Sequence, residues 1–403
     1  MIIFLLVFIF SISYSLEFKV ASYNVENLFD MHYNGTEYRE YIPHKHNWTN
    51  SILNKKLTNI SEVICEIDAD IIGLQEIENR NALKLLQTSL KYYGCNYKYS
   101  AITHKRKSAI EVAILSKIPI KNHKDIIVTK SLGTRNILEV KFIIDNNPIY
   151  IYVNHWNSKR SPDSKRIISA KALKKRLLSL PTKSEYIILG DFNTNYSEER
   201  VNSVLNSINI RENNLSEDIF SHYNLWLEEP IYKRWSYNFY GKKQALDAIF
   251  IPYSLIDGKG IDYINNSFSI FKKSYLFHKR GYILRWEYKK GRHKGVGYSD
   301  HLAIYAKFST RVYIKQNSTV RLSSIKKLLE KNIKLPIKLK QVRVIKSFKK
   351  GVNIKEVLSK DIIPIFGINP KLLLGEIYDI IVYKRKFYNG RYEITDYSII
   401  NKK

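Results

Sequence analysis

Five short polar segments, spread from residue 21 to residue 301, each lie at the end of an apolar, strand-like run. They constrain the fold more than any other feature of the chain. They are 21–29 (ASYNVENLF), 74–77 (LQEI), 153–156 (VNHW), 189–193 (LGDFN) and 297–301 (GYSDH), with a sixth, 246–250 (LDAIF), between the last two. Together they supply carboxylates, carboxamides and imidazoles, with few lysines. A site that binds a hard divalent cation and hydrolyses a phosphate ester needs these groups.

Strand-like runs alternate with helical patterns through the first three quarters of the chain. Apolar residues at helical spacing predict a helix over 52–67, and a strand-like run follows at 70–74. Further helices are expected at 82–90 and 164–178, and further strands at 112–115, 137–144, 149–153 and 186–189. This alternation predicts an α/β fold.

The order and wording of the six segments resemble the endonuclease/exonuclease/phosphatase superfamily, over roughly residues 18–308. That superfamily contains pancreatic-type deoxyribonucleases, abasic-site endonucleases and bacterial sphingomyelinases. The resemblance implies a four-layer α/β sandwich, two sheets with helices outside, for a catalytic domain at 16–310. Within it, 254–297 mixes aromatic residues with Lys and Arg and is interpreted as an excursion from the domain.

The resemblance also implies a metal site. Glu76 would be the principal Mg²⁺ ligand, with Asn24 and Glu26 beside it on the first strand and Asp300 as a further ligand; Mn²⁺ and Ca²⁺ are the alternative ions. A carboxylate at the end of an apolar strand is unfavourable unless it is solvated or bound to a cation. The family often has Asp where this chain has Glu26, so direct ligation by the longer side chain is a departure.

The catalytic groups follow from the same resemblance. Asp191 would activate or orient the attacking water while Asn193 holds a phosphoryl oxygen. His301 would pair with Asp247, since a carboxylate fixes the imidazole tautomer and stabilises its charged form. His155 resembles the general acid of the deoxyribonuclease branch, and Glu111, at the start of the 112–115 strand, is its expected partner.

Three positions are predicted to contact the substrate. Arg135 matches a position where the nucleases place a phosphate-gripping arginine, and guanidinium geometry suits phosphate. Arg106, within the basic stretch 105–107, would add electrostatic contact, and Trp286 is the candidate within the aromatic and basic segment. At the position where pancreatic-type enzymes carry a groove-stacking tyrosine, this chain has Ala109, so the resemblance does not extend to that contact.

Residues 311–403 differ in character from the rest. They contain no His or Cys, and 22 Lys and Arg against 7 Asp and Glu give a net charge of +15. A helix is expected at 323–329 and strands at 337–346, 352–357, 362–366, 376–383 and 391–399, separated by turn signals. Five short strands in this pattern resemble a small OB-like β-barrel, which in several families binds single-stranded nucleic acid. A structural appendage with a solvated basic face is the alternative.

The whole chain of 403 residues carries a formal net charge of +29, which favours a polyanionic partner. Residues 2–10 are uninterruptedly apolar and too short to span a bilayer, and Ser13 and Ser15 suit a cleavage site. Residues 1–15 are therefore predicted to be a signal peptide of an exported protein, periplasmic or secreted. Cys65 and Cys95 are the two cysteines, and the sequence leaves open whether they form a disulfide.

The sequence thus predicts an exported, Mg²⁺-dependent DNA endonuclease of low sequence specificity, acting as a monomer. The aromatic and basic residues of 254–297 are mixed rather than gathered at an apolar tip, which favours nucleic acid over membrane lipid. A sphingomyelinase or other phospholipid-headgroup phosphodiesterase is the main alternative. A catalytically inactive nucleic-acid or surface-binding protein is a further alternative, disfavoured because each motif keeps its carboxylate or histidine.

Overall fold

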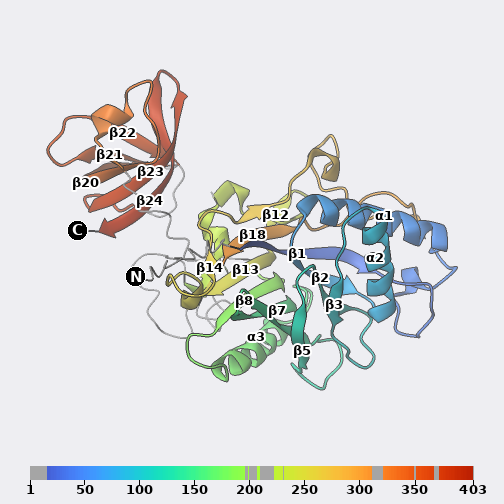
Figure 1. Cartoon of the computed structure of the whole chain (residues 1–403). Helices are drawn as coiled ribbons and strands as arrows, with labels where there is room; N and C mark the ends of the chain where they lie inside the picture. Colours follow the sequence, from blue (N-terminus) through green and yellow to red (C-terminus); the bar gives the residue numbers. More distant parts are fainter. Residues whose placement is uncertain are drawn as a thin grey trace, which may run out of the picture.

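The computed structural model describes residues 16–195, 198, 207–208, 222–229, 231–310, 321–348, 351–366 and 372–402. The predicted signal peptide, residues 1–15, lies outside the described residues. Among the helices that are described, none has the length and apolar character needed to cross a membrane. Figure 1 shows a two-sheet sandwich, formed by residues up to Ser309, and a separate β-structure at the C-terminal end.

The first sheet of the sandwich has the strand order β14-β18-β1-β2-β4-β3, with β15 also paired to β18. Its strands are β1 (Glu17–Leu28), β2 (Ile71–Ile77), β3 (Tyr99–Ile102), β4 (Glu111–Ser116), β14 (Asp262–Tyr263), β15 (Ser269–Ile270) and β18 (Ile304–Ser309). Strands β1 and β2 are parallel, whereas β18 and β4 run antiparallel to them. The central strands are buried on both faces, which explains their continuous apolar runs.

The second sheet has the order β5-β6-β7-β8-β13-β10-β9. Its strands are β5 (Ile120–Ile126), β6 (Ile137–Ile144), β7 (Asn147–His155), β8 (Glu185–Asp191), β9 (Ser207–Ile208), β10 (His222–Asn224) and β13 (Asp247–Pro252). Its inner face packs against the first sheet through one core that includes Val20, Ile71 and Ile151. Strands β7 and β8 are parallel, so their polar C-terminal ends lie side by side.

Helices cover the outer faces of both sheets (Figure 1). Helices α1 (Asn50–Ile67) and α2 (Arg80–Tyr92) pack on the first sheet, and α3 (Asp163–Leu178) packs on the second through Ala170 and Leu173. The predicted four-layer sandwich is confirmed. A disulfide joins Cys65 in α1 to Cys95 after α2, with 5.6 Å between the Cα atoms, which resolves the question that the sequence left open.

The segment 254–297 is not an excursion, contrary to the sequence-based prediction. It contributes β14 and β15 to the first sheet, and Phe268, Phe271 and Trp286 are buried in the cores. Its aromatic residues are divided between the interior and the surface, because these three rings pack inward whereas Tyr282 and Tyr288 are exposed. Short hairpins β11 (Tyr237–Phe239)–β12 (Lys242–Gln244) and β16 (Tyr288–Lys289)–β17 (Arg292–His293) complete this side of the domain.

The C-terminal β-structure is a closed five-stranded barrel, as predicted. Its elements are β19 (Arg321–Leu322), α5 (Ile325–Leu328), β20 (Ile337–Phe348), β21 (Gly351–Glu356), β22 (Ile362–Phe366), β23 (Ile377–Tyr388) and β24 (Arg391–Lys402). The order β20-β21-β22-β24-β23 closes through pairing of β23 with β20. Alternating apolar residues such as Leu339, Ile354 and Ile380 fill a core of their own. Closure leaves the five main strands without a free edge.

Candidate active site

Strand register brings the polar segments together. On the second sheet, His155 lies opposite Asp191 across β7 and β8, and Asp191 lies opposite Asp247 across β8 and β13. On the first sheet, Asn24 in β1 lies opposite Gln75 in β2, one residue before Glu76. The two sheets therefore contribute adjacent strand ends to one site.

The backbone at these strand ends adopts conformations that ordinary residues avoid. Glu26, Glu76 and Asn193 have φ values of 52°, 68° and 49°. Gly190 has a φ of 138°, and a Cβ added there would lie 2.0 Å from the carbonyl oxygen of Asn154 on β7. Non-glycine residues at positive φ cost energy and concentrate at functional sites, where the surrounding structure holds them in place.

His301 is held by two buried partners. Its Nδ1 lies 2.8 Å from Oδ2 of Asp247, and the Ser236 hydroxyl donates to the same oxygen at 2.6 Å. Burial alone would lower the pKa of His301, but the carboxylates of Asp247 and Asp191 outweigh it and hold that pKa well above its usual range. The raised pKa favours the imidazolium form of His301, whose Nε2 lies 3.9 Å from Oδ2 of Asp191, and the pairing with Asp247 is the one that the sequence predicts.

Asp191 lies at the centre of the site. Its Oδ2 is 3.6 Å from Nε2 of His155 and 3.9 Å from Nε2 of His301, and it accepts a hydrogen bond from Asn24 Nδ2 at 3.2 Å. Asn193 caps the same carboxylate through its backbone and side-chain N–H groups. Burial raises the pKa of Asp191, the charged His301 opposes that rise, and Asp247 adds to it.

The structure does not pair His155 with Glu111. Glu111 instead accepts hydrogen bonds from the Thr103 hydroxyl at 2.5 Å and from the Lys105 backbone N–H at 2.8 Å. Within the described part of the chain, the buried Nδ1 of His155 has no hydrogen-bond partner. Burial, with Arg135 and His301 nearby, holds the pKa of His155 well below its usual range. Glu111 is not the partner of His155, because both oxygens of its carboxylate accept hydrogen bonds from Thr103 and Lys105, in the segment that directly follows β3.

Glu76 extends the acidic part of the site toward the first sheet. Its Oε1 accepts from Asn24 Nδ2 at 3.1 Å and lies 3.7 Å from Nε2 of His155. The Asn24 amide is oriented by its oxygen, which accepts from the Glu26 N–H at 3.0 Å. Burial and the carboxylate of Asp300 raise the pKa of Glu76. Among the ion pairs of the described residues, none joins Glu76 or Asp191 to Lys or Arg.

Glu26 is occupied by a cation from the protein itself. The Arg285 guanidinium donates to its Oε1, from Nε at 2.9 Å and from Nη2, and the Trp286 backbone N–H donates to Oε2 at 2.9 Å. Asp300 lies on the other side, with Oδ2 3.6 Å from Arg285. The predicted role of Glu26 as a direct metal ligand does not fit this arrangement, because both of its oxygens are engaged.

Lys56 is a residue that the sequence reasoning missed. Its side chain is fully buried, and its ammonium lies 4.7 Å from the centre of the Trp286 ring. None of the described residues forms a hydrogen bond with Nζ of Lys56. The sequence did contain a signal for Lys56, because this residue occupies a core-facing position of α1 between Leu53 and Leu57.

Trp286 was predicted to contact the substrate. Its side chain is only 2% exposed, so it packs behind the site and does not make that contact.

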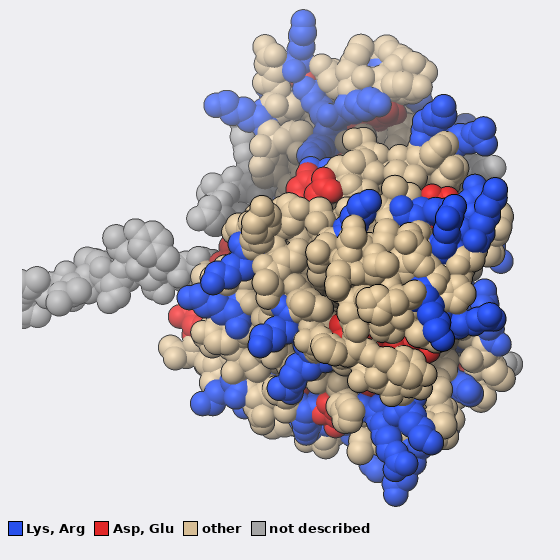
Figure 2. Space-filling model, turned by 90° about the vertical axis from the view of Figure 1, so that its right-hand side faces the viewer, with Lys and Arg blue, Asp and Glu red and all other residues tan. Residues whose placement is uncertain are grey.

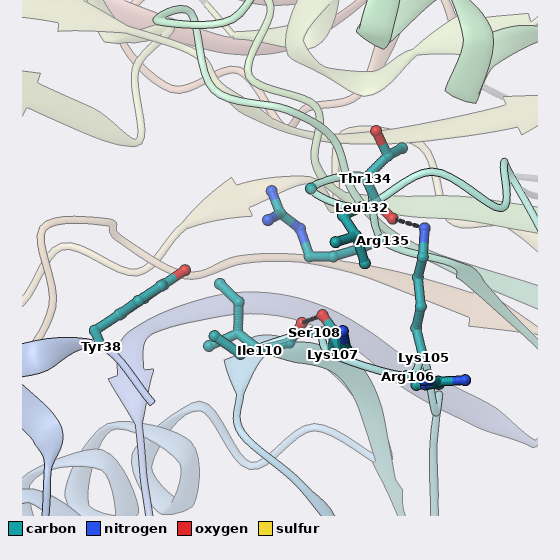
Figure 3. A pocket seen from close by; sticks show the side chains of 11 residues that line it. Tyr38, Lys105, Arg106, Lys107, Ser108, Ile110, Leu132, Thr134 and Arg135 are labelled. Carbon is teal, nitrogen blue, oxygen red and sulfur yellow. Dashed lines mark hydrogen bonds between the residues drawn. The ribbon is translucent and has the colours of Figure 1, made fainter. Parts of the chain in front are cut away.

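A basic pocket of about 200 Å³ adjoins the site (Figure 3). Arg135 is fixed by hydrogen bonds to the carbonyl oxygens of His155 at 3.1 Å and Trp156 at 3.0 Å, and its guanidinium points into the pocket toward Tyr38. Lys105 turns away to bind the Thr134 carbonyl. Arg106 lines the pocket, but its guanidinium extends away from Tyr38.

On the exposed face of the sandwich, acidic and basic side chains are distributed in a way that agrees with the geometry of the site. Figure 2 shows acidic side chains recessed in a furrow near the middle of the face, with Lys and Arg around its margin. A polyanion bound along such a face would be attracted by the margin and would present single phosphates to the recessed carboxylates.

The family model described as Endonuclease/Exonuclease/phosphatase family matches residues 19–310. Similar solved structures include D. rerio TDP2 complexed with single strand DNA product, at 13% identity and a TM-score of 0.48, covering 72% of this chain and 98% of that chain. An endonuclease/exonuclease/phosphatase family protein from Leptotrichia buccalis has 17% identity and a TM-score of 0.44, covering 72% and 99%. SmcL has 17% identity and a TM-score of 0.45, covering 73% and 99%. No curated protein sequence matches the chain.

Proposed function

Since the chain belongs to the endonuclease/exonuclease/phosphatase family, we propose that it is a metal-dependent phosphodiesterase and that its substrate is DNA. The observation that carries the proposal is the buried group formed by Asp191, His301 and Asp247. Asp191 lies between two imidazoles, and one of them, His301, is kept charged by Asp247. A carboxylate can orient the attacking water, and an imidazolium beside it can stabilise the negative charge of the phosphoryl oxygens, so the group supplies two of the functions that phosphodiester hydrolysis uses.

The donor set fits a hard divalent cation. Nε2 of His155 lies 3.7 Å from Glu76 and 3.6 Å from Asp191, and Nε2 of His301 lies 3.9 Å from Asp191 and 4.0 Å from Asp300, so the three carboxylates are grouped around the two imidazoles. Burial and the carboxylate of Asp300 raise the pKa of Glu76, and a bound cation would favour its charged form. Asp191, Asp247 and His301 also offer ligand atoms within 4.8 Å of one another. We favour Glu76 and Asp300 as ligands, because Asp247 and Nδ1 of His301 already hydrogen-bond to each other. When bound, a Mg²⁺ ion would neutralise phosphoryl charge and stabilise the leaving oxygen.

The residues of the chain supply the other steps. Water attacks phosphorus in line with the leaving oxygen, and Asp191 orients this water and accepts its proton. His301 binds a phosphoryl oxygen through Nε2, and Asn193 lies beside it. Nε2 of His155 is the second imidazole nitrogen that faces Asp191. The negative charge of a bound phosphodiester would raise the low pKa of His155, so His155 takes up a proton from solvent when the substrate binds and donates it to the leaving oxygen.

The charge of the chain supports DNA as the substrate. The net charge of the chain is +29, and residues 311–403, which contain the barrel, carry +15 of it. We propose that the barrel acts as an OB-like module that tracks the phosphate backbone. Of the aromatic residues of 254–297 that could support a membrane-binding sphingomyelinase, Phe268, Phe271 and Trp286 are buried in the cores. The Cys65–Cys95 disulfide supports export to an oxidising compartment, with residues 1–15 as the signal peptide.

The test is hydrolysis by the purified mature chain of plasmid DNA, RNA and sphingomyelin vesicles, each with Mg²⁺ and with chelator. We expect nicking of plasmid DNA that depends on the added metal. Hydrolysis of sphingomyelin without cleavage of either nucleic acid would overturn the proposal. His123→Ala, which removes an exposed histidine of β5, serves as the matched control for variants of the two site histidines.

A further inference from the structure

The hairpin formed by β11 and β12 adjoins the catalytic histidine. Tyr237 pairs with His301 in an isolated β-bridge, and the centres of their rings are 4.9 Å apart. Across the hairpin Tyr237 lies opposite Gln244 and Phe239 lies opposite Lys242, so Tyr240 and Gly241 form a two-residue turn. The hairpin therefore extends from His301 to its exposed tip.

Three aromatic side chains line this extension, and we call Tyr237, Phe239 and Tyr240 the aromatic hairpin. Tyr237 and Phe239 are two residues apart on one strand, so they share a face. Their rings are nearly parallel, with an interplanar angle of 13° and centres 6.4 Å apart. The Tyr240 ring lies 4.5 Å from Phe239, edge to face. Phe239 is 48% exposed and Tyr240 is 94% exposed.

The turn holds its tyrosine in an unfavourable conformation. Tyr240 has a φ of 46° and Gly241 a φ of 82°. Two-residue turns with positive φ at both positions favour Asn-Gly or Gly-Gly, and a bulky residue at the first position is an outlier. Because Tyr240 is almost wholly exposed, folding gains little packing from its ring. A strained backbone conformation at a residue whose side chain adds little to packing indicates that the residue has a function.

We propose that the aromatic hairpin is a stacking platform for unpaired nucleobases next to the phosphate hydrolysed at His301. The proposal rests on the proposed function and names the substrate class of the same site, a single-stranded or frayed nucleic acid. Every base offers a π-face, so exposed rings bind bases without reading sequence. The platform begins at the catalytic imidazole, so a base stacked on Phe239 belongs to a nucleotide close to the scissile bond. Lys242 and Lys243 on the facing strand are exposed and add attraction for the backbone.

The hairpin fits bases better than a lipid surface. A loop that enters a membrane gathers apolar residues at its tip, whereas here the strand facing the rings is Lys242, Lys243 and Gln244. The near-parallel planes of Tyr237 and Phe239 present ring faces. A base in a duplex has both faces covered by its neighbours, so the platform favours substrates whose bases are already unpaired.

The test compares two single-stranded oligonucleotides that share one cleavable phosphate. In one of them the nucleotides flanking that phosphate carry bases, and in the other they are tetrahydrofuran residues without bases. Phe239→Ala and Tyr240→Ala are measured in the full chain by kcat/KM and, without turnover, by fluorescence anisotropy in the presence of chelator. We expect each variant to lose about tenfold in both measurements on the base-containing strand, within the range for stacking on one ring. The loss should vanish on the base-less strand.

Two further variants serve as controls for the effect of losing an aromatic ring from the hairpin. Tyr92→Ala removes a tyrosine that is 88% exposed on α2, and it should change neither measurement. Phe239→Trp should restore binding, since it keeps an aromatic face. Equal losses on both oligonucleotides would overturn the proposal, as would loss of binding to phosphatidylcholine–sphingomyelin vesicles with oligonucleotide binding unchanged. Absence of cleavage of any nucleic acid, with the base-dependent anisotropy effect intact, would refute the proposed function and leave the platform standing.

Discussion

The sandwich and the C-terminal barrel carry almost the same net charge but distribute it in opposite ways. The sandwich segment, residues 1–310, has 44 Lys and Arg against 30 Asp and Glu, a net +14, whereas 311–403 reach +15 with 93 residues. In the sandwich, carboxylates are buried at the strand ends and meet His301 and Arg285. In the barrel, two carboxylates, Asp379 and Glu393, are buried among the described residues. The comparison indicates that the two regions have different roles. The sandwich has the desolvated charges that catalysis uses, and the barrel has the exposed charges that attract a polyanion.

The first prediction, with the largest expected effect, tests whether catalytic activity depends on the sandwich alone. His301→Ala or Asp191→Ala should reduce DNA hydrolysis about 10³-fold or more, because each removes a group that handles a proton or meets phosphate. DNA binding should persist, since the barrel is unchanged. Initial rates and anisotropy on one substrate measure both. Turnover near that of the His123→Ala control in either variant would refute the assignment of this site.

The second prediction concerns the acidic half of the site. Glu76→Gln should lose Mg²⁺ binding and hydrolysis together, because a neutral amide is a poor ligand for a hard cation. Calorimetric Mg²⁺ titration and initial rates measure the two effects, which we expect at about 10²-fold each. Glu78→Gln is the matched control, because Glu78 accepts from the Asp30 N–H and does not belong to the site. Unchanged Mg²⁺ affinity in Glu76→Gln would remove that residue from the metal site.

Local patterns predicted the elements of both regions, and long-range register decided what the patterns could not. The helix over 52–67 is α1 and the strand at 362–366 is β22, because apolar periodicity reports burial directly. Periodicity also held the clue to Lys56, on the core-facing side of α1. No local signal distinguishes Arg285 from the other cations of 254–297, since its partner Glu26 lies far away in the sequence.

The same limit explains the failed pairing of Glu111 with His155. The resemblance placed both residues on strand ends, but the two strands belong to different sheets. Glu111 begins β4 of the first sheet, and His155 ends β7 of the second. The separation of the strand ends depends on how the two sheets stack, which the sequence does not show. The pairing of β3 with β4 brings Thr103 to Glu111, and nothing in the sequence indicated this contact. The resemblance did predict one contact between the two sheets, the pairing of His301 with Asp247, but it gave no indication of the local partners that Glu111 finds.

The third prediction removes the barrel. A chain ending at Thr310 should bind DNA more weakly, and the slope of log affinity against log salt should flatten by about 0.9 for each lost phosphate contact. Hydrolysis of short substrates at saturation should survive, because each predicted site residue precedes Thr310. The loss should be larger on single strands, since Phe387 and Tyr388 are exposed on β23. A soluble truncated chain with an unchanged salt slope would show that the barrel is a structural appendage.

The smallest expected effect tests whether buried carboxylates make the stability of the sandwich depend on pH. Burial, with Asp257 and Asp262 nearby, raises the pKa of Glu185 to about 7. A carboxyl group whose folded pKa exceeds its unfolded value favours folding while protonated. Its contribution is therefore complete below the unfolded value of 4.5 and is lost as the pH rises through 7. Glu185→Gln should thus raise the free energy of unfolding at pH 8 by about 1 kcal/mol, since partial solvation reduces the full effect.

That gain should disappear at pH 4.5, where wild-type Glu185 folds protonated. Fluorescence reports on the sandwich alone, because the five tryptophans all precede residue 311. Glu139→Gln is the control of opposite sign, because Glu139 accepts two hydrogen bonds from the Arg176 guanidinium and should destabilise the sandwich when neutralised. A stability gain for Glu185→Gln that is equal at both pH values would mean that the gain does not come from ionisation of Glu185 between them. In that case the pH dependence of the sandwich would have to come from the carboxylates of the site itself.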